Sequence, residues 1–210
     1  NDNGDLYINQ RADDKDIIFQ SDDQFGGITT YFRVDGSTGY VKFEDNRRIA
    51  VGSSDDFMIY HDGTDTKLSN VTGSLQFHQN VNDSDIVFFC DDGSGGTTAY
   101  LTLDGSQGFT TAQKHIRFED DVNAQFGTGA DMGIYHNGSN GFIKNDIGDL
   151  TIQNTANDKD IIFQSDDGSG GTTPYMTIDG GSVKTKFDKD LLLKDSVALQ
   201  LGTDTDAALY

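Results

Sequence analysis

The sequence predicts an all-β protein on three observations. Asp, Gly and Asn, at 33, 25 and 13 residues, make up about a third of the 210-residue chain, and these types favour turns and left-handed backbone over helix. Short runs rich in Ile, Val, Phe, Tyr and Thr separate the turn residues, as is typical of strands. Whole motifs also return at a fixed long spacing, which favours a repetitive β architecture such as a solenoid or fibre.

The repeat is clearest in one ten-residue motif. It reads DKDIIFQSDD from Asp14, DSDIVFFCDD from Asp83 and DKDIIFQSDD from Asp158. The tyrosines Tyr60, Tyr135 and Tyr210 lie 75 residues apart. We therefore predict a repeat unit of about 75 residues, with units at 1–69, 70–144 and 145–210 that together form one elongated shaft segment.

The first and third units depart from the full pattern. The first is six residues shorter, and the motif alignment places the missing residues between Gly36 and Phe43, a step of 7 residues where later units take 13. The third stops in mid-pattern after Tyr210. We therefore expect the chain to be a segment of a longer array.

Each unit is predicted to hold about seven short strands separated by turns. In the first unit these are Asp5–Asn9, Asp16–Ser21, Thr29–Asp35, Gly39–Glu44, Arg47–Gly52, Phe57–His61 and Thr66–Asn70. Between strands, dipeptides of the Asp-Gly and Asn-Gly type predict hairpin turns in which both turn residues have positive φ. They occur at Asp35-Gly36, Asp62-Gly63, Asp104-Gly105 and Asn137-Gly138.

The predicted core is thin, because side chains two apart share a face and each strand offers only about two inward residues. A chain of 22.9 kDa normally buries more than this. Consecutive apolar residues such as Ile86-Val87-Phe88 also require cover on both faces of their strand. We therefore predict an intertwined homotrimeric shaft in which three chains pool their inward side chains. A monomeric β-solenoid and a row of small β-domains are the alternatives.

The charge and cysteine content exclude several classes of function. A net charge of −20 argues against partners such as nucleic acid and anionic membrane surfaces, which attract basic proteins. No apolar run approaches the ~20 residues of a membrane span. A single cysteine, Cys90, excludes an internal disulfide. It replaces Ser21 and Ser165 of the other units, and we interpret it as a small buried residue.

Adjacent carboxylates occur at Asp22-Asp23, Asp91-Asp92 and Asp166-Asp167, beside glycine-rich loops. Catalytic carboxylate pairs stand ~5–10 Å apart on separate supports, whereas these are sequence neighbours and occur three times. We interpret them as turn residues with solvated charge. The loops at 91–96 and 166–171 have ligands for calcium, but they lack the spacing of an EF-hand or a calcium-binding β-roll. Calcium binding is therefore the alternative interpretation.

Histidines and tyrosines are the remaining candidates for chemistry. His61 and His136 occupy equivalent positions at strand ends, where a solvated or turn-bonded role is expected, with an axial metal site as the alternative. His78 and His115 have no neighbour at ligand spacing. Tyr31, Tyr100 and Tyr175 recur on one face, where they either pack across strands or stack on sugars. No residue is predicted to be catalytic or to bind a cofactor or metal, so we do not expect an enzyme.

The order of the motifs resembles a repeat of large virion proteins of marine bacteriophages, cyanophages especially. It runs from Phe126-Gly127 through Ile134–Asn140 and Asn145–Ile152 to Asp160–Gly171 and Tyr175–Gly180. The resemblance covers essentially the whole chain and implies a tail-fibre or other fibrous appendage, generally homotrimeric, that serves host attachment. It implies no catalytic residues. The shortened first unit and its altered loop at Gln24-Phe25 depart from the pattern.

We therefore expect a structural segment of a phage tail fibre or a similar extracellular fibre, located in the virion or outside the cell. Its expected partners are further copies of itself, other virion or fibre subunits, and a host-surface glycan bound through regions outside this chain. A bacterial surface adhesin or extracellular-matrix fibre is the first alternative. A glycan-binding module and a polysaccharide-degrading tail spike are the others.

Overall fold

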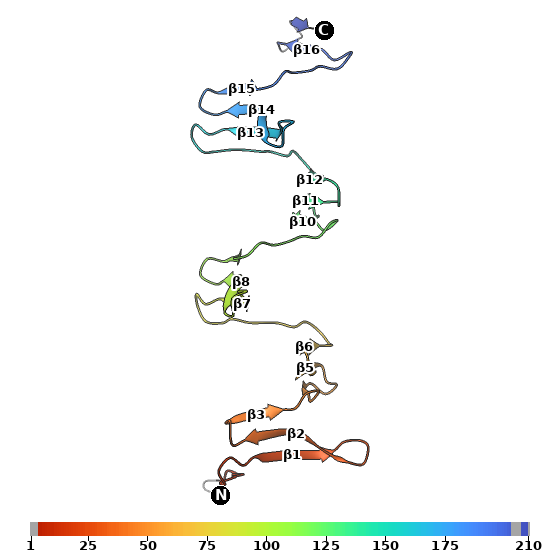
Figure 1. Ribbon diagram of the computed structural model, residues 1–210, viewed down its shortest axis with the longest axis vertical. Coiled ribbons are helices and arrows are strands. Elements are labelled where there is room, and N and C mark those ends of the chain that lie inside the picture. Colours follow the sequence, from red (N-terminus) through yellow and green to blue (C-terminus); the bar gives the residue numbers. More distant parts are fainter. Residues whose placement is uncertain (1–3, 203–206, 210) are drawn as a thin grey trace. The chain divides into compact units, whose positions relative to one another are not determined.

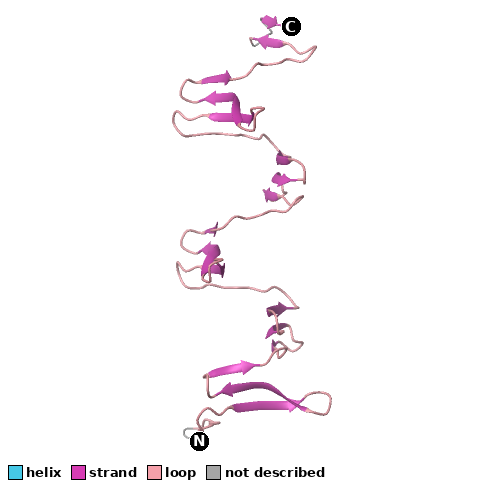
Figure 2. Ribbon diagram, in the orientation of Figure 1, coloured by secondary structure: helices cyan, strands magenta, loops and turns pink. Residues whose placement is uncertain are grey.

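The computed structural model describes residues 4–202 and 207–209, and over this range the chain forms only strands, turns and loops (Figures 1 and 2). The all-β prediction is confirmed. No helix occurs in the described ranges, and hence none that is long and apolar enough to cross a membrane. Tyr210 lies outside the described residues.

The strands form small antiparallel sheets in which each strand pairs with the next along the chain. Three sheets have a long central strand. They are β1 (Ile17–Asp22), β2 (Ile28–Asp35) and β3 (Tyr40–Phe43); β7 (Ile86–Asp91), β8 (Thr97–Asp104) and β9 (Phe109–Ala112); and β13 (Ile161–Asp166), β14 (Thr172–Asp179) and β15 (Lys184–Phe187). We call these the long sheets.

The remaining strands are shorter and form three further sheets. They are β4 (Ile49–Val51), β5 (Phe57–His61) and β6 (Thr66–Asn70); β10 (Ala124–Phe126), β11 (Met132–His136) and β12 (Gly141–Asn145); and the pair β16 (Leu199–Leu201) and β17 (Ala207–Leu209). Six of the seven strands expected in the first unit therefore form. The first, at Asp5–Asn9, is wrong, because these residues have no ladder partner among the described residues.

The chain divides into two compact units, residues 1–114 and 115–210. The first contains the sheets from β1 to β9 and the second those from β10 to β17. A solenoid needs ladders between successive coils, whereas every ladder of the described strands joins sequence neighbours in antiparallel register. Within one chain, therefore, the described residues show small separate sheets and no solenoid.

Each long sheet has one apolar face, because its strands align apolar residues in cross-strand rows. In the β7–β8–β9 sheet, Ile86 pairs with Leu103 and Leu103 with Thr110, while the next row on that face is Phe88, Leu101 and Ala112. The corresponding rows are Ile17, Val34 and Val41 with Phe19, Phe32 and Phe43, and Ile161, Ile178 and Thr185 with Phe163, Met176 and Phe187. We call these residues the apolar rows.

A β-bulge interrupts each long sheet at the same tyrosine. The register shifts between Phe88 and Phe89 so that Tyr100 has no partner on β7, and Tyr31 and Tyr175 occupy the same position in the other two long sheets. A bulge bends its strand and increases the local twist. Pro174 precedes Tyr175 inside β14 rather than at its start, and a bulge is one of the few sheet positions that tolerate a missing N–H.

The predicted two-residue turns at Asp35-Gly36 and Asp104-Gly105 are wrong. The loop has four residues, and it is the last of them, Gly39 or Gly108, that has positive φ, at 72° and 71°. Gly105 is required for another reason, because a Cβ there would lie 2.4 Å from the backbone oxygen of Ser84. At Asp62-Gly63 and Asn137-Gly138 only the glycine has positive φ. Composition indicated where these turns lie but not their type.

The first repeat unit is six residues shorter at a different place from the one that the motif alignment indicated. The β2–β3 and β8–β9 loops match, since Val34 pairs with Val41 and Leu103 pairs with Thr110. Five residues then separate β3 from β4, whereas eleven separate β9 from β10. The shortening is therefore in the connection after Phe43 and leaves the first long sheet complete.

The Gly105 contact leads to a stability prediction. Gly105→Ala forces a Cβ against backbone that cannot rotate away, and we expect it to cost about 3 kcal/mol of unfolding free energy. Gly108→Ala is the matched control, because its Cβ meets nothing within 4 Å and it bears only the left-handed strain of about 1 kcal/mol. Thermal unfolding of both variants tests this, and equal costs would contradict the close approach.

Candidate functional site

The most extensive surface feature is the uncovered apolar face of each long sheet. No hydrophobic residue is buried in the described part of the chain, and its only buried side chains are those of Asp35, Thr102 and Thr177. Phe88 is 49% exposed and Leu103 is 42% exposed, although both lie in apolar rows. The rows thus have side-by-side contacts, such as the stacked rings of Phe19 and Phe32 at 4.3 Å, but no second layer above them.

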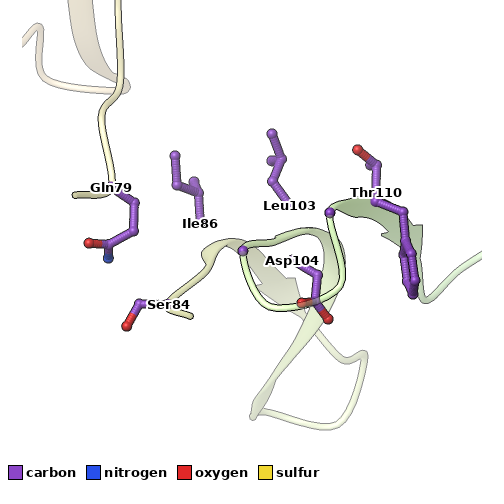
Figure 3. Close-up of a pocket in the computed structure, with 9 residues that line it drawn as sticks. Gln79, Ser84, Ile86, Leu103, Asp104 and Thr110 are labelled. Atoms are coloured by element: carbon purple, nitrogen blue, oxygen red, sulfur yellow. The ribbon is translucent and has the colours of Figure 1, made fainter. Parts of the chain in front are cut away.

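A cavity of about 320 Å³ opens on this face in the β7–β8–β9 sheet (Figure 3). Ile86, Leu103 and Thr110 project to the same side there, while Gln79 and Ser84 come from the segment that precedes β7. A cavity of the same volume occurs at the equivalent place in the third long sheet, lined by Ile178, Asp179, Gly180, Val183, Lys184 and Thr185. Its apolar floor suits an apolar side chain better than a polar metabolite.

The paired carboxylates close the loops that they begin. In the second unit, Asp92 Oδ1 accepts the N–H of Ser94 at 2.8 Å and of Gly96 at 3.1 Å, together with the Ser94 hydroxyl at 2.7 Å. Asp91 Oδ2 accepts the Gly93 N–H at 2.9 Å. The Asp166-Asp167 and Asp22-Asp23 loops repeat this backbone pattern. These carboxylates therefore stabilise turns, as expected from their position beside glycine-rich loops in the sequence.

These hydrogen bonds favour the ionised carboxylate. The Ser94 hydroxyl and the N–H groups of Ser94 and Gly96 lower the pKa of Asp92, and Ser169 and Gly171 do the same for Asp167. One oxygen of each of these carboxylates is thus engaged by the loop itself. Within residues 4–202 and 207–209, no three His, Cys, Asp or Glu side chains gather as metal ligands would.

The recurring tyrosines are attached to the same loops. The hydroxyl of Tyr100 donates to the carbonyl oxygen of Asp91 at 3.2 Å, and Tyr31 and Tyr175 donate to Asp22 and Asp166 at 3.0 and 3.2 Å. Their rings are 38–44% exposed. This arrangement matches the expected packing within the sheet, because each tyrosine ties the bulge to the end of the neighbouring strand.

Histidines and carboxylates pair twice beside the short sheets. Nδ1 of His61 lies 3.0 Å from Asp45 Oδ1, and Nδ1 of His136 lies 2.9 Å from Asp120 Oδ1. Each Nδ1 also lies 3.1 Å from a glycine N–H, that of Gly63 or Gly138. Both histidines are therefore turn-bonded. His78 instead bonds the side chain of Gln76 at 2.8 Å.

Cys90 is exposed, so its interpretation as a small buried residue is wrong for the single chain. It lies in β7 opposite Thr98, beyond the bulge, where no other layer covers the hairpin. The error has the same origin as the uncovered apolar rows, because a two-stranded hairpin end exposes both faces unless another chain packs on it.

Ion pairs across the β2–β3 hairpin were missed from the sequence. Lys42 Nζ donates to Asp35 Oδ2 at 2.7 Å and, with the Ser37 hydroxyl, lowers the pKa of Asp35. Lys186 pairs with Asp179 in the same way in the third long sheet. The signal was an Asp and a Lys seven residues apart across a four-residue loop. These pairs stabilise the hairpins by joining neighbouring strands.

No protein-family model, curated protein or solved structure matches the chain.

The loop carboxylates predict a pH dependence. Because the pKa of Asp92 is lowered on folding, its contribution to stability is complete above its unfolded pKa of about 4 and is lost as pH falls through the folded value. We therefore expect Asp92→Asn to lower the melting temperature at pH 7 and to differ less from the unsubstituted protein at pH 2. Thermal unfolding at both pH values measures this. Asp83→Asn, at a carboxylate that receives no backbone N–H, is the control.

Proposed function

We propose that the chain is a structural segment of a homotrimeric fibre, of the bacteriophage tail-fibre kind, that spaces and stiffens an appendage used for host attachment. The observation that carries the proposal is the uncovered set of apolar rows, which occurs at the same place in all three long sheets. A fibre segment meets this requirement because neighbouring chains supply the missing layer.

The exposed apolar surface is much larger than an isolated chain tolerates. In the described residues, 46 large hydrophobic side chains are exposed. With about half of each side chain accessible, their combined area is on the order of 4,000 Å², against the roughly 800 Å² per partner of a standard interface. Covering it at about 25 cal/mol per Å² is the main favourable free energy available to this chain. Association with further copies is the simplest way to gain it.

Three copies suit the two-sided exposure better than two. Ile18 and Ile162 lie on the face opposite the apolar rows and are 54% and 53% exposed, so that face also has apolar side chains to cover, beside the polar Arg33 and Thr177. A two-fold dimer uses the same patch on both subunits and leaves the second face open. In a closed three-fold ring each chain contacts two neighbours through different surfaces, and both faces are then covered.

The net negative charge of the chain supports a fibre exposed to a medium of high ionic strength. With a net charge of −20, each chain repels stray contacts at its sheet edges, which limits edge-to-edge aggregation. The repeat order, which resembles that of marine phage virion proteins, supports the same assignment. In this proposal receptor binding belongs to regions outside the chain, in agreement with loops and tyrosines that are occupied by their own turns.

Absolute mass in solution tests the oligomer. By light scattering after size exclusion we expect about three times 22.9 kDa, unchanged in EDTA because the loop carboxylates bind their own backbone. A compact monomer would overturn the trimer, and a trimer that dissociates in EDTA would overturn the metal-free loops.

The location of the protein is tested separately. An antibody raised against the chain should label the tails of purified phage particles in electron micrographs, with particles from a phage that lacks the gene as the control. Labelling of bacterial surfaces without particles would overturn the virion assignment and favour an adhesin.

A further inference from the structure

We propose that three segments of this chain, residues 6–10, 74–80 and 150–155, are interaction surfaces that bind a second copy of the chain by strand pairing. We call them the open segments. The inference rests on the proposed function and goes beyond it, because it states which backbone joins the copies.

Residues 74–80 and 150–155 run as drawn-out connections between strands (Figure 1), and the backbone of all three open segments lacks hydrogen bonds. Among the described residues, no hydrogen bond involves a backbone N–H or C=O of 74–80, although β6 before it and β7 after it are both paired. The same holds for 6–10 and for 150–155. Backbone polar groups that become buried need partners, so a chain that must cover its apolar surface must also pair these groups.

The side chains of residues 74–80 and 150–155 alternate as in a strand with one covered face. Leu75 and Phe77 are 45% and 62% exposed, and the polar Gln76 lies between them. Leu150 and Ile152 are 47% and 57% exposed around Thr151. A period of two places the apolar members of each pair on one face. Flexible loops have no reason to alternate, and these segments contain neither Gly nor Pro.

Charge favours a second copy as the occupant. The open segments contain no Asp, Glu, Lys or Arg, although the chain as a whole carries −20. Two copies of so acidic a chain repel each other wherever their carboxylates meet, and like charges opposite each other destabilise a ladder. The open segments let backbones approach without that repulsion. Each occurs once per repeat unit of the sequence, so a single mode of pairing serves all of them.

The cavity in the β7–β8–β9 sheet provides a place for the incoming side chains. Gln79 at the end of an open segment forms one wall, and the apolar row Ile86, Leu103 and Thr110 forms the floor (Figure 3). A strand of the second copy that pairs with 74–80 extends its apolar face over this row. Backbone pairing and cover of the apolar rows then occur in one step.

Hydrogen exchange on the assembled protein tests the pairing directly. In the trimer we expect amides of 74–80 and 150–155 to exchange about a hundredfold more slowly than unpaired amides do. Gly95, whose N–H donates no hydrogen bond in the loop 93–96, is the internal reference for fast exchange. A trimer in which the open segments exchange as fast as the Gly95 amide would overturn the inference and leave the proposed fibre intact. A monomer would overturn the proposed fibre, and fast exchange in that monomer would overturn strand pairing as well.

A pair of matched double variants tests the face. Leu75→Asn with Phe77→Asn puts two polar amides on the apolar side, and we expect it to raise the concentration for half-dissociation about a hundredfold or more. Gln76→Asn with His78→Asn changes the opposite side without adding charge, and we expect less than about a tenfold change. Equal dissociation of both variants would overturn the assigned face. Protection of the β7–β8 amides in each variant shows that its sheet is folded, and if the first variant does not fold, the exchange map of the unsubstituted protein decides.

Discussion

The structure depends on one constraint, which is that a single chain cannot cover its own apolar rows. Each long sheet aligns two rows of apolar side chains on one face, and the described part of the chain provides no layer to pack against them. A sheet that is hydrophobic on one face must bury that face against another element to form a stable domain. The same uncovered face occurs in all three long sheets, and the proposed fibre covers each of them with partner chains.

The hairpins of this molecule are consequently ordered without the burial of apolar side chains. The hairpins are determined by short-range interactions, such as the Asp92 carboxylate that holds its loop and the Tyr100 hydroxyl that holds its bulge. These interactions need no core and survive in water, because charged and backbone groups satisfy one another within a few residues. They shape each sheet within the single chain, so assembly of the proposed fibre would mainly bury apolar surface rather than order loops.

The strand alternation of the long sheets could be predicted because it depends only on residues close together in the sequence, such as Phe32 and Val34. The loop roles of Asp91 and Asp92 could be predicted for the same reason. The turn at Gly105 could not, because its glycine is required by the distant backbone of Ser84. The exposure of Cys90 and the missing ladder at Asp5–Asn9 depend on which segments pack nearby, and neighbouring residues in the sequence do not determine that.

Strong acidity and a large apolar surface are compatible here because they occupy different positions. The carboxylates lie mainly at turns and strand ends, where they bond their own loops, while the apolar rows carry no charge. Two chains in arbitrary orientation bring turns against rows and meet repulsion and desolvation cost together. Only an aligned approach brings row against row. In the proposed fibre, the charge pattern would therefore select the register of assembly, and hydrophobic burial would supply its free energy.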